Sequence, residues 1–544
     1  MSHAPLPVAE SGYPKNQIVS GLVALFAIYF AVSFYVQTIV VARPRMTADL
    51  DGMALYSWSI SIPALAAAFA TLLLSKFSDI YGRRLILMLS MGTFLAGTVL
   101  SAVSPTFPIL IGATTLYRFG AGAALPLVFA VLGDMFAPAE RSRWVGLLNI
   151  PQGTAALFGP TLAGWFVDQL SWRYLYWLGA PLIVACILLI PRGIPASTRK
   201  ASAKIDTRGA VLIAIASSAT ILGFSFAGTT YPWASIQVIG LLGIALLFWI
   251  LFFWAENHVD EPIMDPQVFQ NRTFLTVAVA GLLSSFGLTG MMMYYSVLLQ
   301  GVMGISATTY GKIITPFSLL MAFIGVPAGF ALARTKRYKW MYIASYTLLT
   351  IVIAGITFFD AKTPVYMTAF AAILAGLGLG AIPTVNTMVA QCAVPRRLLG
   401  AAMGAIFFCI SMGMAISPAV LGSVMDVSYA KSLEMTLPAA LRQSADEATM
   451  KALRDPKALL SPTAMKYLQT RFNRTEDAGR RLFDQSVEAI RTSTQIAVRS
   501  TFLLGAVTML LAFLLILTVP EISMDVSVAD KKAPAKIAVE ELAD

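Results

Sequence analysis

Fourteen long apolar segments constrain this chain more than any other feature, because each has the length that a helix needs to cross a lipid bilayer. A bilayer core about 30 Å thick accepts helices of roughly 17 to 25 apolar residues. Unbroken apolar runs favour helices over a transmembrane barrel, whose strands alternate apolar and polar residues. The segments are residues 18–42, 54–74, 85–103, 107–133, 144–167, 174–191, 209–228, 236–254, 273–301, 308–333, 340–359, 364–390, 400–424 and 500–519.

The composition is that of a membrane protein. Of 544 residues, 57% are hydrophobic and 12% are charged, whereas a soluble domain has about 25% charged residues. The net charge of +11 does not indicate a nucleic-acid partner, because in a membrane chain the placement of charge matters more than its sum. Residues 1–16 lack the basic start and the small-residue cleavage site of a signal peptide, so we expect the first apolar segment to be retained.

The Lys and Arg residues predict the orientation. With the N-terminus in the cytoplasm, the cytoplasmic segments contain 21 Lys and Arg, and the short outer loops contain four. Positive charge gathers on the cytoplasmic side of multi-pass membrane proteins. We therefore expect a protein of the cytoplasmic (inner) membrane with two cytoplasmic tails, residues 1–17 and 520–544.

The longest loop, residues 425–499, is predicted to be an insertion on the outer side. Parts of it have the pattern of amphipathic helices, and the last of these leads toward the final span. The insertion is expected to act either as a cap on the outer loops or as a docking surface for another protein.

The loop between the second and third segments concentrates charge in a chain that has little of it. In the sequence SKFSDIYGRRLIL, Asp79 lies at the membrane edge, Gly82 permits a tight turn, and Arg83 and Arg84 begin the next helix. A carboxylate in that position can cap the N-terminus of a neighbouring helix, which is favourable by about 0.3 to 2 kcal/mol. Because such a contact can form in one conformation and break in another, we expect Asp79 to act as a latch.

This loop resembles the signature that the major facilitator superfamily has at the same place. A weaker copy, GFALARTKRYKW, joins the tenth and eleventh segments and has Ala333 where the acid would be. The resemblance implies an all-α membrane protein with 14 transmembrane helices, built from two pseudo-symmetric six-helix bundles plus two extra central helices. The expected domains are residues 18–191 for the N-terminal bundle, 209–254 for the two linker helices and 273–519 for the C-terminal bundle.

Two further segments carry the resemblance. In the fourth, Arg118 precedes FGAGAALP, and Asp134 follows at the cytoplasmic end, where the resemblance implies pairing with the loop arginines. In the fifth, GTAALFGPTLAGW resembles an antiporter signature through Gly159 and Pro160, which allow helices to pack closely and to bend. The linkers SWRYLYW, IDTRGAVL and DEPIMDPQVFQNRTF resemble those of the fourteen-helix drug:proton antiporter branch, a group of multidrug exporters.

Charge is almost absent from the fourteen segments, which contain Arg118 and Lys312 but no Asp or Glu. A charge at the centre of a membrane helix costs about 2.5 kcal/mol or more, so Arg118 is assigned a functional role. Lys312 is near an outer end and can reach the interface. Exporters of cationic drugs in this branch often have an acid in the first helix, and here Tyr35 takes its place. Proton coupling is therefore expected to use Asp79, Asp134 and Arg118.

The remaining polar and aromatic residues suit a roomy, mostly apolar substrate pocket, with helix packing as the alternative explanation. The substrate-binding candidates are Tyr35, Gln37, Asn149, Gln152, Tyr294, Tyr295, Gln300 and Asn386. The gate and coupling candidates are Asp79, Gly82, Arg83, Arg84, Arg118, Asp134, Gly159 and Pro160.

These features favour a secondary transporter that exports lipophilic drugs or toxic compounds by alternating access in exchange for protons. Two alternatives stay open: a transporter of a lipid or an anionic metabolite, and a membrane sensor that does not transport. An enzyme is not expected, since no cluster of His, Asp, Glu or Cys marks a catalytic site, and an ATP-driven pump would need a P-loop.

The expected partners are a small lipophilic substrate, protons and the lipid bilayer. No metal or other cofactor is expected, because the chain has only two histidines, His3 and His258, and they cannot build a metal site. The sequence leaves open whether a membrane-fusion protein also binds.

Overall fold

The computed structural model describes residues 14–52, 55, 58–194, 206–228, 231–259, 262–438, 449–450, 453–454, 468–472 and 476–521. Most of the N-tail, the C-tail and a large part of the predicted insertion lie outside the described residues.

The described residues are almost entirely helical. The α-helices are α1 (Lys15–Asp49), α2 (Trp58–Tyr81), α3 (Arg83–Ala102), α4 (Phe107–Met135), α5 (Pro138–Leu147), α6 (Asn149–Gln169), α7 (Arg173–Gly193), α8 (Thr207–Phe226), α9 (Ile236–Glu256), α10 (Pro266–Gln270), α11 (Arg272–Thr289), α12 (Ala307–Phe323), α13 (Gly325–Thr335), α14 (Lys339–Ile356), α15 (Val365–Cys392), α16 (Leu399–Thr436) and α20 (Glu476–Leu517). Two π-helical turns, η2 (Gly290–Tyr294) and η3 (Val297–Val302), continue α11, and a short 3₁₀ turn, η4 (Arg396–Leu398), precedes α16.

The fold is the expected all-helical membrane architecture. Among the described residues, thirteen helices are long and apolar enough to cross a membrane, with α11 and the π turns counted as one span and α12 and α13 as another. The remaining predicted segment, residues 144–167, corresponds to α6, which is separated from the short α5 by a break at Leu148.

The helices pack as two groups. In the first, α4 packs on α2 and α3, and α1 packs on α6 and α7. In the second, α11 packs on α16 and α20, and α15 packs on α12 and α14. The hairpin of α8 and α9 packs on α2 of the first group and on α16 of the second. We call these groups the N-terminal bundle (α1–α7) and the C-terminal bundle (α11–α20).

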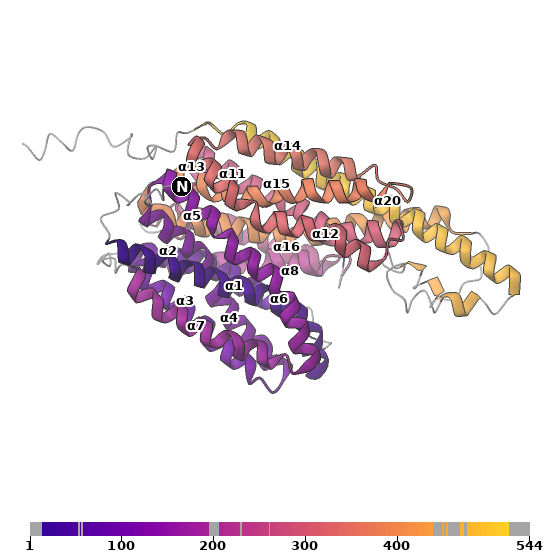
Figure 1. The fold of residues 1–544 in the computed structure, drawn as a ribbon. Coiled ribbons are helices and arrows are strands. Elements are labelled where there is room, and N and C mark those ends of the chain that lie inside the picture. Colours follow the sequence, from indigo (N-terminus) through magenta and orange to yellow (C-terminus); the bar gives the residue numbers. More distant parts are fainter. Residues whose placement is uncertain are drawn as a thin grey trace, which may run out of the picture.

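The two bundles converge at one end of the molecule and spread apart toward the other (Figure 1). The convergent end contains the end of α2, the start of α3 and the start of α16, and we call it the Asp79 end. Both described chain ends lie there. Ser20 near the start of α1 donates to the carbonyl of Arg192 at the end of α7, and Tyr338 donates to the carbonyl of Pro520.

Helices α16 and α20 are much longer than the predicted spans, which they extend at the end opposite Asp79 (Figure 1). The extensions are joined by a hydrogen bond of 3.0 Å between Thr436 Oγ1 and Ser493 Oγ, and Tyr429 donates to the carbonyl of Leu453 at 2.6 Å. Hydropathy does not reveal such extensions, because charged residues occupy their exposed faces. The last part of the predicted insertion is therefore one helix with the final span.

Candidate functional site

A tight turn places the charged residues of the Asp79 end. Helix α2 ends at Tyr81 and α3 begins at Arg83, so Gly82 alone separates them. Its φ of 97° lies in the left-handed region, which side chains with a Cβ rarely adopt. The turn brings Arg83 back beside Asp79, and the two form an ion pair.

Asp79 caps the first turn of α16, which belongs to the other bundle. Its carboxylate accepts hydrogen bonds from the backbone N–H groups of Gly400, at 3.2 Å, and Ala401, at 2.8 Å. The first N–H groups of a helix have no partner within the helix, and the helix dipole favours an anion at this position. The carboxylate is 7% exposed, so water competes little for these bonds.

Arg83 connects this cap to α4. Its Nε donates to Asp134 Oδ2 at 2.8 Å, and its Nη1 donates to Ser78 Oγ at 2.6 Å. The pairing that the sequence predicted for Asp134 is therefore made by Arg83. Arg84 is half-buried and, within the described part of the chain, takes no part in this group of ion pairs.

Small residues on α16 allow its close approach to α2. A Cβ on Gly400 would collide with Asp79 and Arg83, and a Cβ on Gly404 would lie 2.7 Å from the Cβ of Ser75. Only glycine fits at these positions without moving one helix away from the other. Neither glycine is recognisable as a contact residue from the sequence, because its partner lies more than 300 residues away in the chain.

A second polar link between the bundles lies beside the first. Arg141 in α5 donates to Gln391 Oε1 in α15 at 3.2 Å and to the carbonyl of Gly133 at 2.7 Å. Gln391 in turn donates to the carbonyl of Phe129 in α4 at 3.0 Å. These buried residues were not identified from the sequence, since a lone Arg in a loop and a lone Gln in a span carry no recognisable motif.

Helices α5 and α13 cross at short distance at the same end. A Cβ on Gly329 would lie 2.7 Å from the Cα of Gly146. Asn149, one of the substrate-binding candidates, is buried at the edge of this crossing, where its Nδ2 donates to Thr384 Oγ1 at 3.3 Å. The Asp79 end is thus closed by packing as well as by charge.

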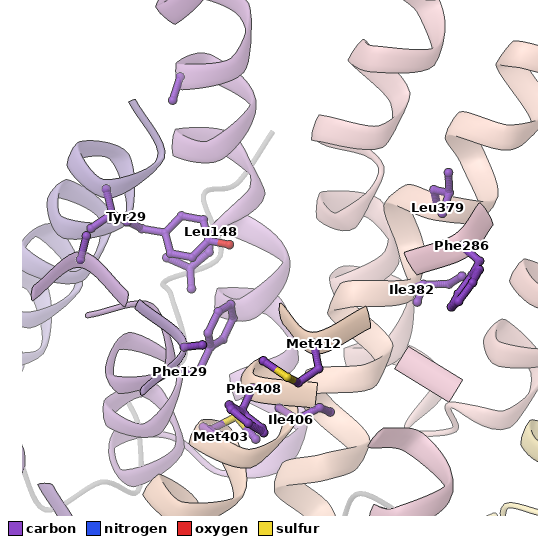
Figure 2. Packing of buried hydrophobic residues seen from close by; sticks show 14 of the residues in the cluster. Tyr29, Phe129, Leu148, Phe286, Leu379, Ile382, Met403, Ile406, Phe408 and Met412 are labelled. Carbon is purple, nitrogen blue, oxygen red and sulfur yellow. The ribbon is translucent and has the colours of Figure 1, made fainter. Parts of the chain in front are cut away.

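Apolar and aromatic side chains from both bundles pack in one buried cluster (Figure 2). Phe129 connects this cluster to the closed end, because its carbonyl accepts the hydrogen bond from Gln391. Phe129 of α4 stacks on Phe407 of α16 with ring centroids 5.3 Å apart. Tyr29 of α1 lies edge-on to Phe129 at 5.7 Å, and its hydroxyl donates to Gln152 Oε1 at 3.1 Å. Gln152 is exposed, whereas Tyr29 and Phe129 are 8% and 5% exposed, so the accessible part of this group is the amide beside buried aromatic rings. Tyr29 was not among the predicted residues.

The other candidates of the N-terminal bundle have packing contacts. Tyr35 is 1% exposed, lies in a group of aromatic rings and donates to the carbonyl of Tyr176 at 3.0 Å. Gln37 is half-buried, and its Cβ would be 3.1 Å from a Cβ on Gly159. Pro160 follows within α6. Gly159 therefore serves the contact between α1 and α6.

In the C-terminal bundle the candidates are dispersed. Asn386 is buried and accepts a hydrogen bond from Tyr342 at 2.8 Å, whereas Tyr295 is buried and donates to the carbonyl of Thr368 at 2.6 Å. Tyr294 and Gln300 lie in the two π-helical turns, and Gln300 is half-buried. The structure thus does not bring these four residues together.

The two charged residues of the predicted segments differ in setting. Lys312 is exposed on α12. Arg118 is half-buried in the middle of α4, and no carboxylate among the described residues forms an ion pair with it. The structure does not join Arg118 to Asp79 and Asp134.

Comparison with known proteins gives consistent results. Residues 25–418 match the model of the Major Facilitator Superfamily. The chain is 26% identical over 480 residues to the multidrug transporter protein MdtP of Bacillus subtilis, with 86% of each chain covered. It is also 26% identical over 422 residues to multidrug resistance protein 3 of the same organism, with 77% of this chain and 81% of the relative covered.

The fold also resembles that of solved structures. The crystal structure of the human organic anion transporter MFSD10 superposes with a TM-score of 0.57 at 15% sequence identity, covering 93% of this chain and all of that one. At this identity the likeness concerns the fold alone.

Proposed function

Because the chain belongs to the Major Facilitator Superfamily and is therefore a membrane transporter rather than an enzyme, we propose that it exports lipophilic drugs or other toxic compounds in exchange for protons. Relatives named as multidrug transporters support the choice of substrate class. The excess of Lys and Arg in the predicted cytoplasmic segments supports a location in the cytoplasmic membrane with both termini inside the cell.

The observation that carries this proposal is that polar contacts join the two bundles at the Asp79 end and that apolar residues of both bundles lie beside these contacts. Asp79 joins the bundles at one end through the start of α16, and Arg141 joins them through Gln391. The adjoining residues of both bundles are aromatic and aliphatic (Figure 2), and Tyr29 forms a polar pair with Gln152. Alternating access requires contacts that close one end and open again. A substrate that binds an apolar aromatic surface is lipophilic.

Proton coupling is proposed to act through Asp79 and Asp134. Both carboxylates contact Arg83, so protonating either one removes an attraction that holds the closure together. Arg118, which the sequence pattern grouped with these two acids, does not contact them. We propose that its positive charge in α4 contributes to proton coupling through its electrostatic potential.

The test is a resistance panel in a host that lacks its own exporters, repeated with a protonophore. Expression should protect against several unrelated lipophilic compounds, and the protonophore should abolish the protection. In vesicles, transport should follow an imposed pH gradient. Transport that follows only the substrate gradient would show a facilitator and would refute the exchange with protons.

A second candidate function is export of a lipid or an anionic metabolite, and Arg118 is the observation that favours it. A half-buried guanidinium that forms no ion pair with a carboxylate in the described part of α1–α20 can attract an anionic group. Replacing Arg118 by Gln would separate the two proposals. Loss of transport of anions with retention of neutral substrates would favour the anionic class.

A further inference from the structure

Two buried carboxylates lie where the linker hairpin meets α2, away from the contacts between the bundles. Asp206 caps α8, and its Oδ1 accepts a hydrogen bond from the Gly209 N–H at 2.9 Å. Glu256 is the last residue of α9, and it accepts hydrogen bonds from the N–H groups of Ile263 at 3.3 Å and Met264 at 3.0 Å. Asp206 is 8% exposed and Glu256 is 2% exposed.

The two carboxylates face one another across Gly209. Glu256 Oε1 lies 2.7 Å from the position that a Cβ on Gly209 would take, and Asp206 Oδ2 lies closer still. The two oxygens are therefore within about 5 Å of each other, a distance at which one carboxylate opposes the ionisation of its neighbour. Asp206 Oδ2 is buried and has no hydrogen-bond partner among the described residues. A buried acceptor without a partner is costly, and a proton on it would provide the missing hydrogen bond.

The charges around the pair balance when it holds one proton. Lys76 of α2 is 5% exposed and lies close enough to attract the Glu256 carboxylate. Helix α16, which also packs on α8, has no charged residue between Leu399 and Met425. Asp265, in the loop after α9, accepts a hydrogen bond from the Gln267 N–H instead. Arg208, in the first turn of α8, is exposed to solvent. Among the described buried groups at this point, two carboxylates and one ammonium group leave one uncompensated negative charge, which burial penalises.

We propose that Asp206 and Glu256 form a proton-binding site on the linker hairpin, in which the two carboxylates share one proton taken up from solution between Asp206 Oδ2 and Glu256 Oε1. The site is separate from the Asp79, Arg83 and Asp134 group. The ligand of this site is a proton. Whether the proton is bound sets the net charge of the two carboxylates beside Lys76.

The position of Lys76 links this site to the closure between the bundles. Lys76 precedes Asp79 by three residues on α2, so the same helix end contacts the linker hairpin through one residue and α16 through the other. The hairpin also contacts both bundles directly, through Trp58 and Phe226 at 5.5 Å and through Trp249 and Phe408 at 6.0 Å. Loss of the proton leaves the carboxylate pair more negative and strengthens its attraction for Lys76. The consequence of this attraction for transport rests on the proposed function.

The site is tested on the purified full-length protein by infrared difference spectroscopy during a pH titration in H₂O and D₂O. At about pH 7, where ordinary carboxyl groups are ionised, the protein should show one protonated carboxyl band that shifts in D₂O. Asp206→Asn and Glu256→Gln should each abolish it, because either amide supplies an N–H donor in place of the proton. Glu434→Gln, at an exposed position on α16, is the matched control and should leave the band unchanged.

Lys76→Gln should extend the band to higher pH, because it removes the charge that favours the ionised pair. A wild-type protein without the band at about pH 7, or a band that survives either amide substitution, would overturn the proton site. The wild-type titration decides this even where a variant does not fold. The link to transport is measured separately: Glu256→Gln should flatten the pH profile of flux, and an unchanged profile would refute the link while leaving the spectroscopic result intact.

Discussion

Asp79 concentrates several interactions in one buried carboxylate. It accepts hydrogen bonds from the N–H groups of Gly400 and Ala401 in the first turn of α16 and pairs with the Arg83 guanidinium, and Arg83 continues the contact to Asp134. Removing the charge leaves Arg83 buried with Asp134 as its remaining carboxylate and leaves the start of α16 with a weaker acceptor. The closed end should therefore depend on this residue more strongly than on any exposed acid.

The first prediction concerns Asp79→Asn. The variant should fold and reach the membrane, because Asn also accepts N–H bonds at helix starts. Its closed state should lose at least about 1.4 kcal/mol, which is a tenfold change in population, and vesicle flux should fall by a similar factor. Asp49→Asn, at an exposed position on α1, is the control. Normal flux in a well-expressed Asp79→Asn variant would disprove the latch.

The second prediction concerns Gly400→Ala. The added Cβ would meet both Asp79 and Arg83, so α16 must move away from α2 and the cap must lengthen. Flux should drop about as much as in Asp79→Asn, although no charge changes. Gly164→Ala is the matched control, because nothing lies within 4 Å of its Cβ position. Equal flux in the two alanine variants would show that the close approach of α16 is not needed.

Single residues also show how far sequence reasoning reaches into the site. The motif placed Asp79 and Arg83 correctly within their loop, because a turn through Gly82 is a local property. The partners on α16 were not predictable, since they depend on how distant helices pack. Tyr35 was selected by alignment with a motif and proves to be buried in aromatic packing, whereas Tyr29, which contacts Gln152, belongs to no motif.

Helices were predictable where hydropathy alone defines them. Segments such as 107–133 and 364–390 agree with α4 and α15 within two residues at each end. Helix ends that contain charged residues were not predictable in this way. Glu256 was missed because the predicted span stopped two residues before it. The π-helical turns after α11 were also unforeseen, because insertion of one residue into a helical turn leaves no trace in hydropathy.

The third prediction concerns the extensions of α16 and α20. They pack on each other at the end opposite Asp79, away from the residues that close the molecule. Deleting residues 435–475 should therefore lower the thermal stability of the purified protein but preserve part of the flux. Complete loss of flux in a deletion variant that is properly inserted, together with loss of a cellular response, would favour the sensor hypothesis over the transporter.

Across the molecule, negative charge is restricted to certain regions. The acids described at the Asp79 end, including Asp134 and Glu256, lie at helix termini, and among the described residues the central turns of the spans contain none. Arg118 adds a positive charge within α4. Beside Tyr29 and Phe129, the described residues thus offer a positively charged substrate aromatic rings and one exposed amide, whereas the exposed acid Asp426 lies farther along α16, near Tyr294.

The fourth prediction is that charge selectivity follows from this distribution. A dication in a low-dielectric site needs an anionic partner, because an unpaired charge there is heavily penalised. Aromatic rings such as those of Tyr29 and Phe129 can hold a monocation by roughly 0.5 to 2 kcal/mol, which does not replace a carboxylate for two charges. Cells that express the protein should therefore gain clear protection against a weakly acidic uncoupler and little against a bis-quaternary biocide.

The comparison is made in one strain at equal expression, with Tyr29→Ala and Tyr35→Ala as a matched pair. Tyr29→Ala should also lower stability, because Tyr29 is 8% exposed, but it should reduce protection against monocationic lipophiles more than protection against neutral ones, because it removes the ring beside Gln152. Tyr35→Ala should act on all substrates alike, because it opens a cavity within the N-terminal bundle and lowers stability by about 3 to 5 kcal/mol, as for other large buried aromatic side chains. Stronger protection against the dication than against the uncoupler would mean that an anionic group reaches the substrate, and the proposed apolar surface would be the wrong site.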